Sequence, residues 1–380
     1  MIQEAHSLEA GKLILQGTAV SKRVQYVDIA KGIGIILVVM GHNDFALISP
    51  FAHKLIYSFH MPMFFFMSGM FFKPDVPFLT FLWNRFNGIL KPFFSILLLI
   101  YFASLSFSKI SIVIVSRRLL KAMYGSGFYI DWVQLWFLPH LFAVSLFAYF
   151  FFKAVKRIHP VQLRWVILTI IYIVGVLSMK LFWPFELNIL GTTLTLYGLP
   201  YGLDMVIVSG FFFIVGYEVN KNRRGAFFAN PLTFLFSGIL LLFLVWYFPA
   251  RIDFNLRQFD SLMINTAEAL IGILFVIALS RQIERLGWLS SALSYVGQAS
   301  LIVLIFQVPI QDFWGQKLLA TTGNPKFSYW ISFLIGVIGP LLINALFIHP
   351  NPIVREWFGQ PAPDKRVQMK ESLVKQHAVW

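Results

Sequence analysis

Long apolar runs recur along the whole chain, and they limit its fold more than any other feature. Most are close to the ~20 residues that a helix needs to cross a bilayer. The runs are continuous rather than alternating, which favours helices over the strands of a barrel. We therefore predict an all-α polytopic integral membrane protein with about ten transmembrane helices. The predicted spans are Asp28–Ile48, Ile56–Phe72, Gly88–Phe107, Trp132–Phe152, Arg164–Phe182, Leu203–Asn220, Pro231–Phe248, Met263–Ser280, Ala292–Gln311 and Ser328–Ile348.

The composition supports a membrane protein. Of 380 residues, 58% are hydrophobic and only 13% are charged, and the mean hydropathy is +0.73. These values lie outside the range of soluble globular proteins. The chain has no cysteine, which excludes disulfides, thiolate metal sites and a cysteine nucleophile. The net charge of +14 is spread over alternate loops rather than along one stripe, which argues against nucleic acid as a partner.

The loop charges predict the orientation. With a cytoplasmic N-terminus, nineteen lysines and arginines lie on the cytoplasmic side and ten on the other, so we expect both termini to be cytoplasmic. We predict a cytoplasmic N-terminal segment (1–24), one ten-helix membrane domain (25–350) and a cytoplasmic C-terminal tail (351–380) that is poorly ordered. The basic stretch Ser108–Gly127 is predicted to be an amphipathic surface helix or a loop lying on the membrane.

Two ionisable residues, Lys31 and His42, lie eleven positions apart in the first run. At ~100° per residue they share one helix face, separated by roughly 16 Å along the axis. Ionisable side chains in a membrane face a bundle interior or a polar pathway, because hydrocarbon does not solvate them. A cation at the membrane edge and a deep histidine on the same face indicate a long anionic ligand that extends into the membrane.

Fixing the orientation divides the other embedded polar residues into two groups. One group is predicted near the outer face on five different spans: His42, His60, Asp204, Glu268 and Gln307. The other group lies at the cytoplasmic edge: Asp28, Lys31, Arg85 and Lys91. A basic inner end and an outer group of histidine and carboxylate side chains predict a site with two ends, joined by a continuous polar passage through the bilayer.

Each of these residues also has a structural interpretation, which the sequence leaves open. The inner cations could extend to lipid headgroups, and His60 could bond a backbone carbonyl. The two carboxylates could pair with Arg251 or Arg257 in the neighbouring loop. The glutamine could join two helices. His42 is the least well explained in this way, because its own span also supplies Asp28 and Lys31.

Two motifs carry a resemblance to a known family. The first is YVDIAKGIGIILVVMGH at Tyr26–His42, and the second is FHMPMFFFMSG at Phe59–Gly69. Weaker echoes are Leu135–Pro139, Leu203–Asp204 with Gly216–Tyr217, and Gly297–Leu301 with Gln307. Over about Val24–Phe358 the chain resembles the membrane acyltransferase-3 family, especially the branch that O-acetylates sugars.

The resemblance implies an enzyme that moves an acyl group, most simply acetyl, from cytoplasmic acyl-CoA to an acceptor at the outer face. It implies a bacterial inner membrane location and an envelope polysaccharide, such as lipopolysaccharide, or its lipid-linked precursor as acceptor. His42 matches the family's catalytic histidine. Lys31 stands where many members have arginine, and Gln307 stands where relatives often have histidine. Acetyl-CoA would be a co-substrate, and we expect no tightly bound cofactor and no metal.

The expected roles follow from these arguments. We predict that His42 is catalytic, as a general base or as a covalent acyl carrier, and we favour the base. Glu268 or Asp204 would orient the imidazole or bind sugar hydroxyls. The phosphates of coenzyme A would lie at the inner edge, and Gly32, Gly34 and Gly41 would let its arm approach the first span. The remaining predicted residues are Lys31, Arg85, Lys91 and Asp28 for acyl-CoA, and His60, Trp136, Gln307 and Asn43 for the acceptor.

The competing hypothesis is a transporter or flippase of a lipid-linked sugar without acyl transfer. Such proteins also bury scattered charges, but no inverted repeat is visible in this sequence. Transport also does not explain the pairing of Lys31 with His42 on one face. The expected partners are acyl-CoA, a glycan or lipid-linked saccharide and the lipid bilayer, with no nucleic acid; a homo-oligomer is left open.

Overall fold

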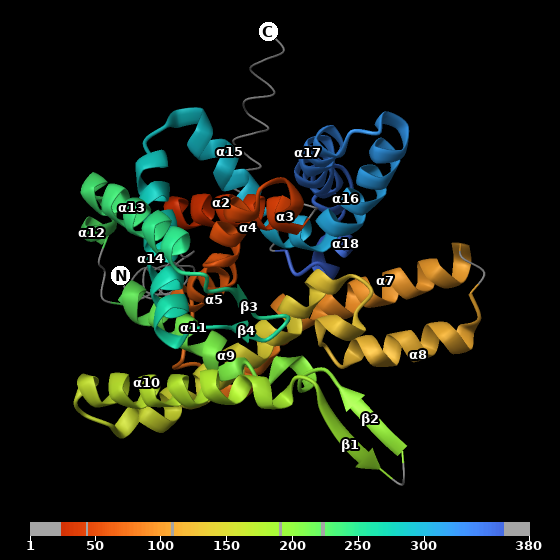
Figure 1. Ribbon diagram of the computed structural model, residues 1–380. Coiled ribbons are helices and arrows are strands. Elements are labelled where there is room, and N and C mark those ends of the chain that lie inside the picture. Colours follow the sequence, from red (N-terminus) through yellow and green to blue (C-terminus); the bar gives the residue numbers. More distant parts are fainter. Residues whose placement is uncertain (1–23, 43–44, 108–109, 190–191, 222–224, 361–380) are drawn as a thin grey trace, which may run out of the picture.

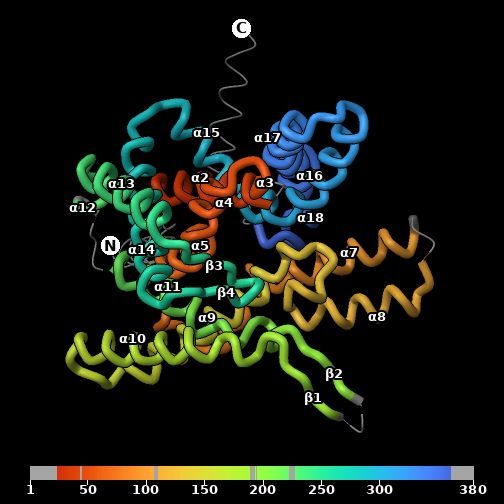
Figure 2. The backbone as a smooth tube through the Cα atoms, viewed as in Figure 1, coloured from red at the N-terminus to blue at the C-terminus, as the bar shows by residue number. Residues whose placement is uncertain are grey.

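The computed structural model describes residues 24–42, 45–107, 110–189, 192–221 and 225–360, and its architecture is helical (Figure 1). Helices from the start and the end of the chain lie side by side around α2, as the backbone tube also shows (Figure 2). The helices are α2 (Gln25–His42), α3 (Phe45–Ile48), α4 (Pro50–Tyr57), α5 (His60–Met70), α6 (Phe78–Arg85), α7 (Lys91–Phe107), α8 (Ile112–Met123), α9 (Phe137–Ala154), α10 (Val161–Ser178), α11 (Val206–Lys221), α12 (Gly225–Ala229), α13 (Pro231–Tyr247), α14 (Leu262–Ile283), α15 (Gly287–Gln298), α16 (Ser300–Thr322), α17 (Pro325–Ile343) and α18 (Pro352–Trp357).

Several helices are long and apolar enough to cross a membrane. In the described part of the chain there are five such helices, or six if the bent pair α15–α16, which turns by 76°, counts as one span. They are Phe78–Ser106, Val133–Arg157, Val161–Phe182, Leu262–Ile283 and Pro325–Ile348. The second predicted span is instead divided, because a break separates α4 from α5. The described parts of the first are α2 and α3. The prediction of a helical multi-pass membrane protein therefore holds at this coarser level.

Helix α2 lies at the centre, packed against α15, α14, α16 and α5. Its contact with α15 is close because both helices present glycine. A Cβ at Gly32 would lie 2.2 Å from the carbonyl oxygen of Leu293, and one at Gly297 would lie 1.8 Å from that of Asp28. Small residues allow such backbone contact between membrane helices. These glycines fix the height and rotation of α2.

A second close crossing joins α5 to α11. A Cβ at Gly69 would lie 1.8 Å from the carbonyl oxygen of Phe213, and one at Gly216 would lie 2.0 Å from that of Phe66. The two crossings hold the first and second sequence motifs against separate helices. The motifs therefore serve packing as well as any chemistry.

Two short antiparallel hairpins interrupt the helical fold, and the sequence analysis did not predict them. Strands β1 (Phe185–Ile189) and β2 (Thr192–Leu196) form one, and β3 (Ile252–Asp253) and β4 (Gln258–Phe259) form the other. The α7–α8 pair and the β1–β2 hairpin project from one side of the molecule (Figure 1). The predicted amphipathic segment does contain a helix, α8, whose first turn is capped by Ser111.

The C-terminal region departs from the prediction of a poorly ordered tail. Residues Pro352–Trp357 form α18, begun by the side chain of Asn351, which accepts hydrogen bonds from the next turn. Phe358 is buried and packs on Phe306 with ring centroids 6.0 Å apart. The tail prediction was wrong for this part because Phe358 provides an apolar anchor, and residues 361–380 lie outside the described residues.

Candidate functional site

One face of α2 forms the wall of a cavity. Lys31, Ile35, Val38 and His42 all line it, at the i, i+4, i+7 and i+11 spacing of a helical stripe. The other walls come from α5, from the π-helical turn Phe86–Leu90, from the start of α9 and from α16. This Lys31–His42 cavity has a volume of about 180 Å³. The predicted shared face of Lys31 and His42 is confirmed.

The walls of the Lys31–His42 cavity are mainly apolar, which corrects the prediction of a polar passage. Aliphatic, methionine and aromatic side chains supply most of the lining, and Gln134, Ser68 and Ser300 are its polar members besides Lys31 and His42. The three glycines of α2 do not line it. Gly32 contacts α15 as described, while Gly34 and Gly41 have their nearest neighbours on α4 and α5. These glycines serve helix packing rather than approach of a ligand.

His42 ends α2 and has a defined tautomer. Its Nδ1 lies 2.8 Å from the carbonyl oxygen of Val38, one turn earlier. Because a carbonyl can only accept, Nδ1 carries the proton when the ring is neutral, and Nε2 keeps its lone pair. The side chain is partly buried. The helix thus presents an imidazole whose second nitrogen can accept a proton.

His42 also lines a second cavity. This α16–α17 cavity has a volume of about 450 Å³ and is bounded by α3 and by the α16–α17 pair. Gln311, Asp312, Gln316, Ser328 and other polar side chains contribute to its lining. His42 is the residue that the two linings share. The imidazole therefore contributes both to a mainly apolar cavity and to a cavity with several polar side chains.

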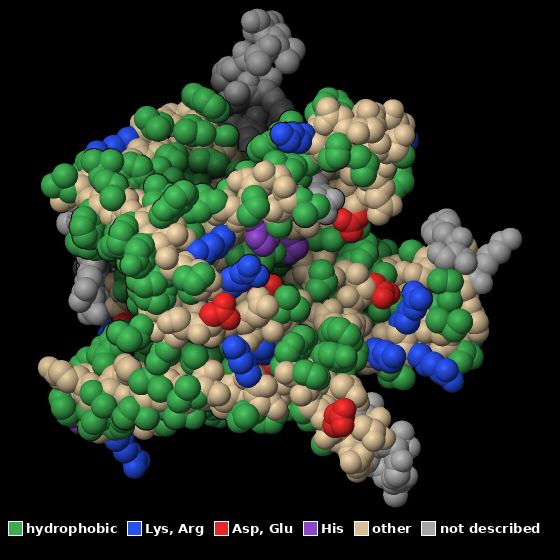
Figure 3. Space-filling view, in the orientation of Figure 1, with side chains coloured by type: hydrophobic (Ala, Val, Ile, Leu, Met, Phe, Trp, Pro, Cys, Tyr) green, Lys and Arg blue, Asp and Glu red, His purple; other side chains and the backbone are tan. Residues whose placement is uncertain are grey.

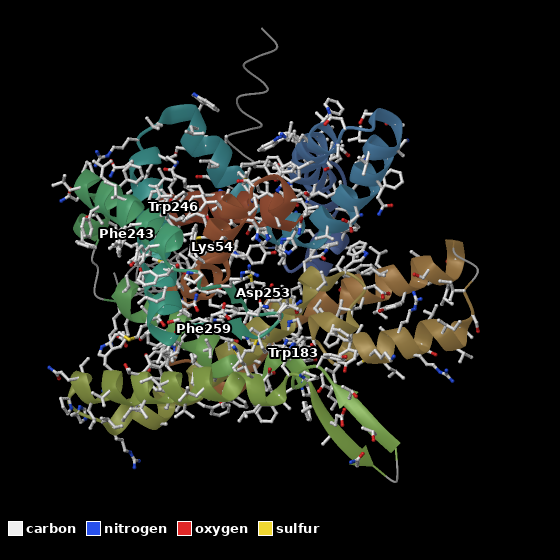
Figure 4. All side chains as sticks on the ribbon, in the orientation of Figure 1. Lys54, Trp183, Phe243, Trp246, Asp253 and Phe259 are labelled. Atoms are coloured by element: carbon white, nitrogen blue, oxygen red, sulfur yellow. The ribbon has the colours of Figure 1, made fainter. Side chains whose placement is uncertain are left out.

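Further titratable groups surround His42. His60 is buried at the start of α5, and its Nδ1 lies 2.9 Å from the carbonyl oxygen of Ile56, so the carbonyl bond proposed as its structural role is present. His60 and Asp253 are both within electrostatic range of His42. Histidine side chains gather at the centre of the face shown in Figure 3, and Lys54 and Asp253 are labelled in the same region in Figure 4.

Asp253 was missed by the sequence analysis. It lies in β3, outside the membrane-spanning segments, and its Oδ1 accepts a hydrogen bond of 3.0 Å from the backbone N–H of Leu256. Burial raises the pKa of the Asp253 carboxyl above its usual range, and nearby N–H groups oppose that rise. A two-residue strand in a polar loop gave no periodic signal by which it could have been found.

Asp204 is held by a buried ion pair. Arg257 Nε donates to Asp204 Oδ2 at 2.7 Å and Nη2 donates to Oδ1 at 3.2 Å. Both side chains are at most 1% exposed. The guanidinium also lies 4.5 Å from the ring centre of Trp183, which Figure 4 labels near the base of the β1–β2 hairpin. Asp204 thus has the arginine partner that its structural interpretation required, and it lies outside both cavity linings.

Glu268 is fully buried in α14 and is likewise absent from both linings. The cation within its electrostatic range is Lys54, whose ammonium donates to the backbone carbonyls of Val245 and Phe248. The sequence grouped Glu268 with His42 by depth alone. Depth does not specify which face of a helix a residue occupies, so the structure does not bring these two residues into one cavity.

The predicted inner residues differ in their positions. Lys31 lines the Lys31–His42 cavity and lies 5.3 Å from the ring centre of Phe71. Arg85 stacks over Phe72 and Phe81 at 5.5 and 5.7 Å. Lys91 lies 3.4 Å from a carboxylate oxygen of Glu356 in α18, and Asp28 is buried where α2 crosses α15.

The predicted acceptor residues are also divided. Trp136 lines the Lys31–His42 cavity. Gln307 is fully buried and its Oε1 accepts from Gln311 Nε2 at 2.5 Å, so it bonds within its own helix. Asn43 lies outside the described residues. Gln134 and Gln311 were missed, although the spacing of Gln307 and Gln311 by one helical turn is a signal that could have found the second.

A family model, described as an acyltransferase domain, matches residues 24–349. That match contains both cavities and every candidate membrane span among the described residues. The chain belongs to the acyltransferase-3 family. No curated protein and no solved structure matches the chain. Membership supports membrane acyltransferase activity, and it agrees with the resemblance carried by the two N-terminal motifs.

Proposed function

We propose that this acyltransferase-3 protein is an O-acyltransferase, most simply an O-acetyltransferase, that uses cytoplasmic acyl-CoA and acylates a hydroxyl of an envelope glycan or its lipid-linked precursor. One observation carries the proposal: His42 is shared by the cavity that reaches Lys31 and by the α16–α17 cavity. A donor and an acceptor bound in the two cavities would meet at this imidazole. A transporter would have no need of a base at the junction.

The Lys31–His42 cavity would hold the pantetheine arm of the donor. Its 180 Å³ is below the ~300 Å³ of small-molecule sites, so only part of coenzyme A would enter. The phosphates would remain at the inner end, where Lys31 supplies a cation. The apolar walls would exclude water from the thioester and so limit its hydrolysis.

Nε2 of His42 would then act as general base. It would remove the proton of the acceptor hydroxyl while the oxygen attacks the thioester carbonyl. Collapse of the tetrahedral intermediate would form the C–O ester bond and break the C–S bond. The departing thiolate would take the proton back from the imidazolium, which regenerates the neutral ring. The Nδ1–H bond to Val38 holds the ring in the required tautomer throughout.

Asp204 is bound by Arg257 and we assign it a structural role, while the catalytic role of Glu268 stays a prediction. Arg85, Lys91 and Asp28 stay predictions as acyl-CoA residues, and His60, Trp136 and Gln307 as acceptor residues. We further propose ten spans, from the number of apolar runs, and cytoplasmic termini, from the loop charges. The bacterial inner membrane is proposed because the family resemblance implies it.

The test is thiol release from acetyl-CoA by the purified protein in lipid nanodiscs with a crude envelope-glycan fraction. The chain has no cysteine, so a thiol reagent reports coenzyme A without a protein background. We expect His42→Ala to lose roughly 10²–10⁴-fold in rate, the usual contribution of a general base. The matched control is His159→Ala, which removes an exposed histidine and should retain full activity.

Full thiol release by His42→Ala would overturn the proposal. Mass spectrometry of the glycan provides the second readout, because each transfer adds one acetyl mass. A wild-type protein that moves the glycan across the bilayer without adding this mass would support the transporter instead.

A further inference from the structure

The α16–α17 cavity contains a buried amide pair whose hydrogen bonding is incomplete. Gln311 is 1% exposed and lines the cavity, and Gln307, one helical turn earlier in α16, is 0% exposed. Their single mutual hydrogen bond leaves Gln311 Oε1 and Gln307 Nε2 without partners among the described residues. Buried polar groups in proteins are nearly always paired. A cavity-lining amide with an unfilled acceptor position therefore points to a ligand with a hydroxyl.

The wall that carries Gln311 is held at a fixed position relative to His42. The Tyr329 hydroxyl of α17 donates to the carbonyl oxygen of Met40, two residues before His42, at 3.0 Å. Gly336 of α17 makes room for Gln311, because a Cβ there would lie 2.5 Å from its Cγ. The amide and the imidazole are thus two fixed points on one cavity.

The charge of the lining restricts the ligand. Its polar side chains are mainly amides and hydroxyls, and Asp312 is its acidic member. No lysine or arginine occurs among the described residues that line it. A phosphate or carboxylate would therefore meet no lysine or arginine among these residues. The volume of about 450 Å³ lies within the ~300–1,000 Å³ of small-molecule sites, and Tyr329 and Leu319 provide apolar surface.

We propose that the α16–α17 cavity binds an uncharged sugar ring of the acceptor, and that Gln311 accepts a hydrogen bond from one of its hydroxyls and so positions a second hydroxyl at His42. The inference rests on the proposed acyl transfer, which it extends by naming the acceptor subsite and the charge it selects. Acidic sugar units are excluded from this subsite, although they can occur elsewhere in the same glycan.

The experiment measures binding in the cavity without catalysis. Leu319 lines the cavity and is 43% exposed, so Leu319→Cys introduces the single cysteine of an otherwise cysteine-free chain. The rate of maleimide labelling is followed in nanodiscs with a panel of neutral methyl hexosides, and with methyl glucuronide as the charged counterpart. We expect at least one neutral glycoside to slow labelling several-fold at millimolar concentration, and the glucuronide to have little effect.

In the same background, Gln311→Leu should weaken the binding of the protecting glycoside about fivefold, which is the effect of losing one neutral hydrogen bond. Gln311→Asn, which keeps the amide but shortens it, should act in the same direction and guards against misfolding of the leucine variant. Gln162→Leu makes the same chemical change at an exposed position and should leave protection unchanged.

Three results would overturn the inference: no protection by any neutral glycoside, equal protection by the glucuronide, or unchanged protection after both changes at Gln311. Because labelling needs no acyl-CoA, these failures are separate from failure of the proposed function. Failure of the proposed function would appear instead as undiminished acetyl transfer by His42→Ala.

Discussion

The Asp204–Arg257 pair allows a quantitative test of whether Asp204 stabilises the fold or takes part in catalysis. Asp204→Asn keeps the shape of the side chain but removes the charge that faces Arg257. Both partners are at most 1% exposed, so the guanidinium would remain buried without a counter-ion. Breaking a buried pair from one side costs about 3–5 kcal/mol. We expect the free energy of unfolding to fall by that amount.

The assay is reversible unfolding of the detergent-solubilised protein, with thiol release from acetyl-CoA measured on the folded fraction. Asp260→Asn is the matched control, because Asp260 is exposed and accepts one backbone hydrogen bond, from Arg251. It should cost less than about 1 kcal/mol. The double variant Asp204→Asn with Arg257→Leu should be less destabilised than the sum of the single variants.

The reasoning is refuted if Asp204→Asn unfolds like the wild type. If the same variant also loses kcat by orders of magnitude, Asp204 acts in the chemistry, as the sequence analysis predicted. A loss of stability with kcat retained within about twofold assigns it to the fold.

Two further changes test other parts of the account. Lys31→Met should raise the KM for acyl-CoA roughly 10- to 100-fold with little change in kcat, because a hydrogen bond to a charged group contributes about 1.5–3 kcal/mol. Lys31→Arg keeps the charge and should restore the wild-type KM. An unchanged KM for Lys31→Met in steady-state assays would exclude a phosphate contact. Gly297→Ala should lower both the free energy of unfolding and the affinity for acyl-CoA, because the added methyl would overlap the carbonyl oxygen of Asp28 and displace α2; wild-type values for both would show that α15 does not set the position of α2.

The sequence was sufficient for the central helix and for the helix face that carries Lys31 and His42. The fixed geometry of a helix places Lys31 and His42 on one face whatever surrounds it, and both line the same cavity. Family membership was also recognisable, because the two N-terminal motifs are local in sequence.

Features that depend on contacts between distant segments could not be predicted. The α16–α17 cavity forms where a late helical pair meets the end of α2. Asp253 approaches His42 through a turn of the chain that has no periodic pattern. Glu268 shared a predicted depth with His42, but the direction in which its side chain points follows from the packing of α14 against α13, α2 and α5. The hydropathy of the sequence predicts how deep a residue lies in the membrane, but not the direction in which its side chain points around the helix axis.

The central claim is that His42 promotes transfer of an acyl group from a donor in one cavity to an acceptor in the other. Acyl transfer between the two sides of a membrane tests this claim most directly. Protein in sealed liposomes receives labelled acetyl-CoA on the side of Lys31 and a membrane-impermeant glycan acceptor on the opposite side only. We predict labelled glycan on the opposite side with wild-type protein and none with His42→Ala. Label appearing only when donor and acceptor share one compartment would contradict the account.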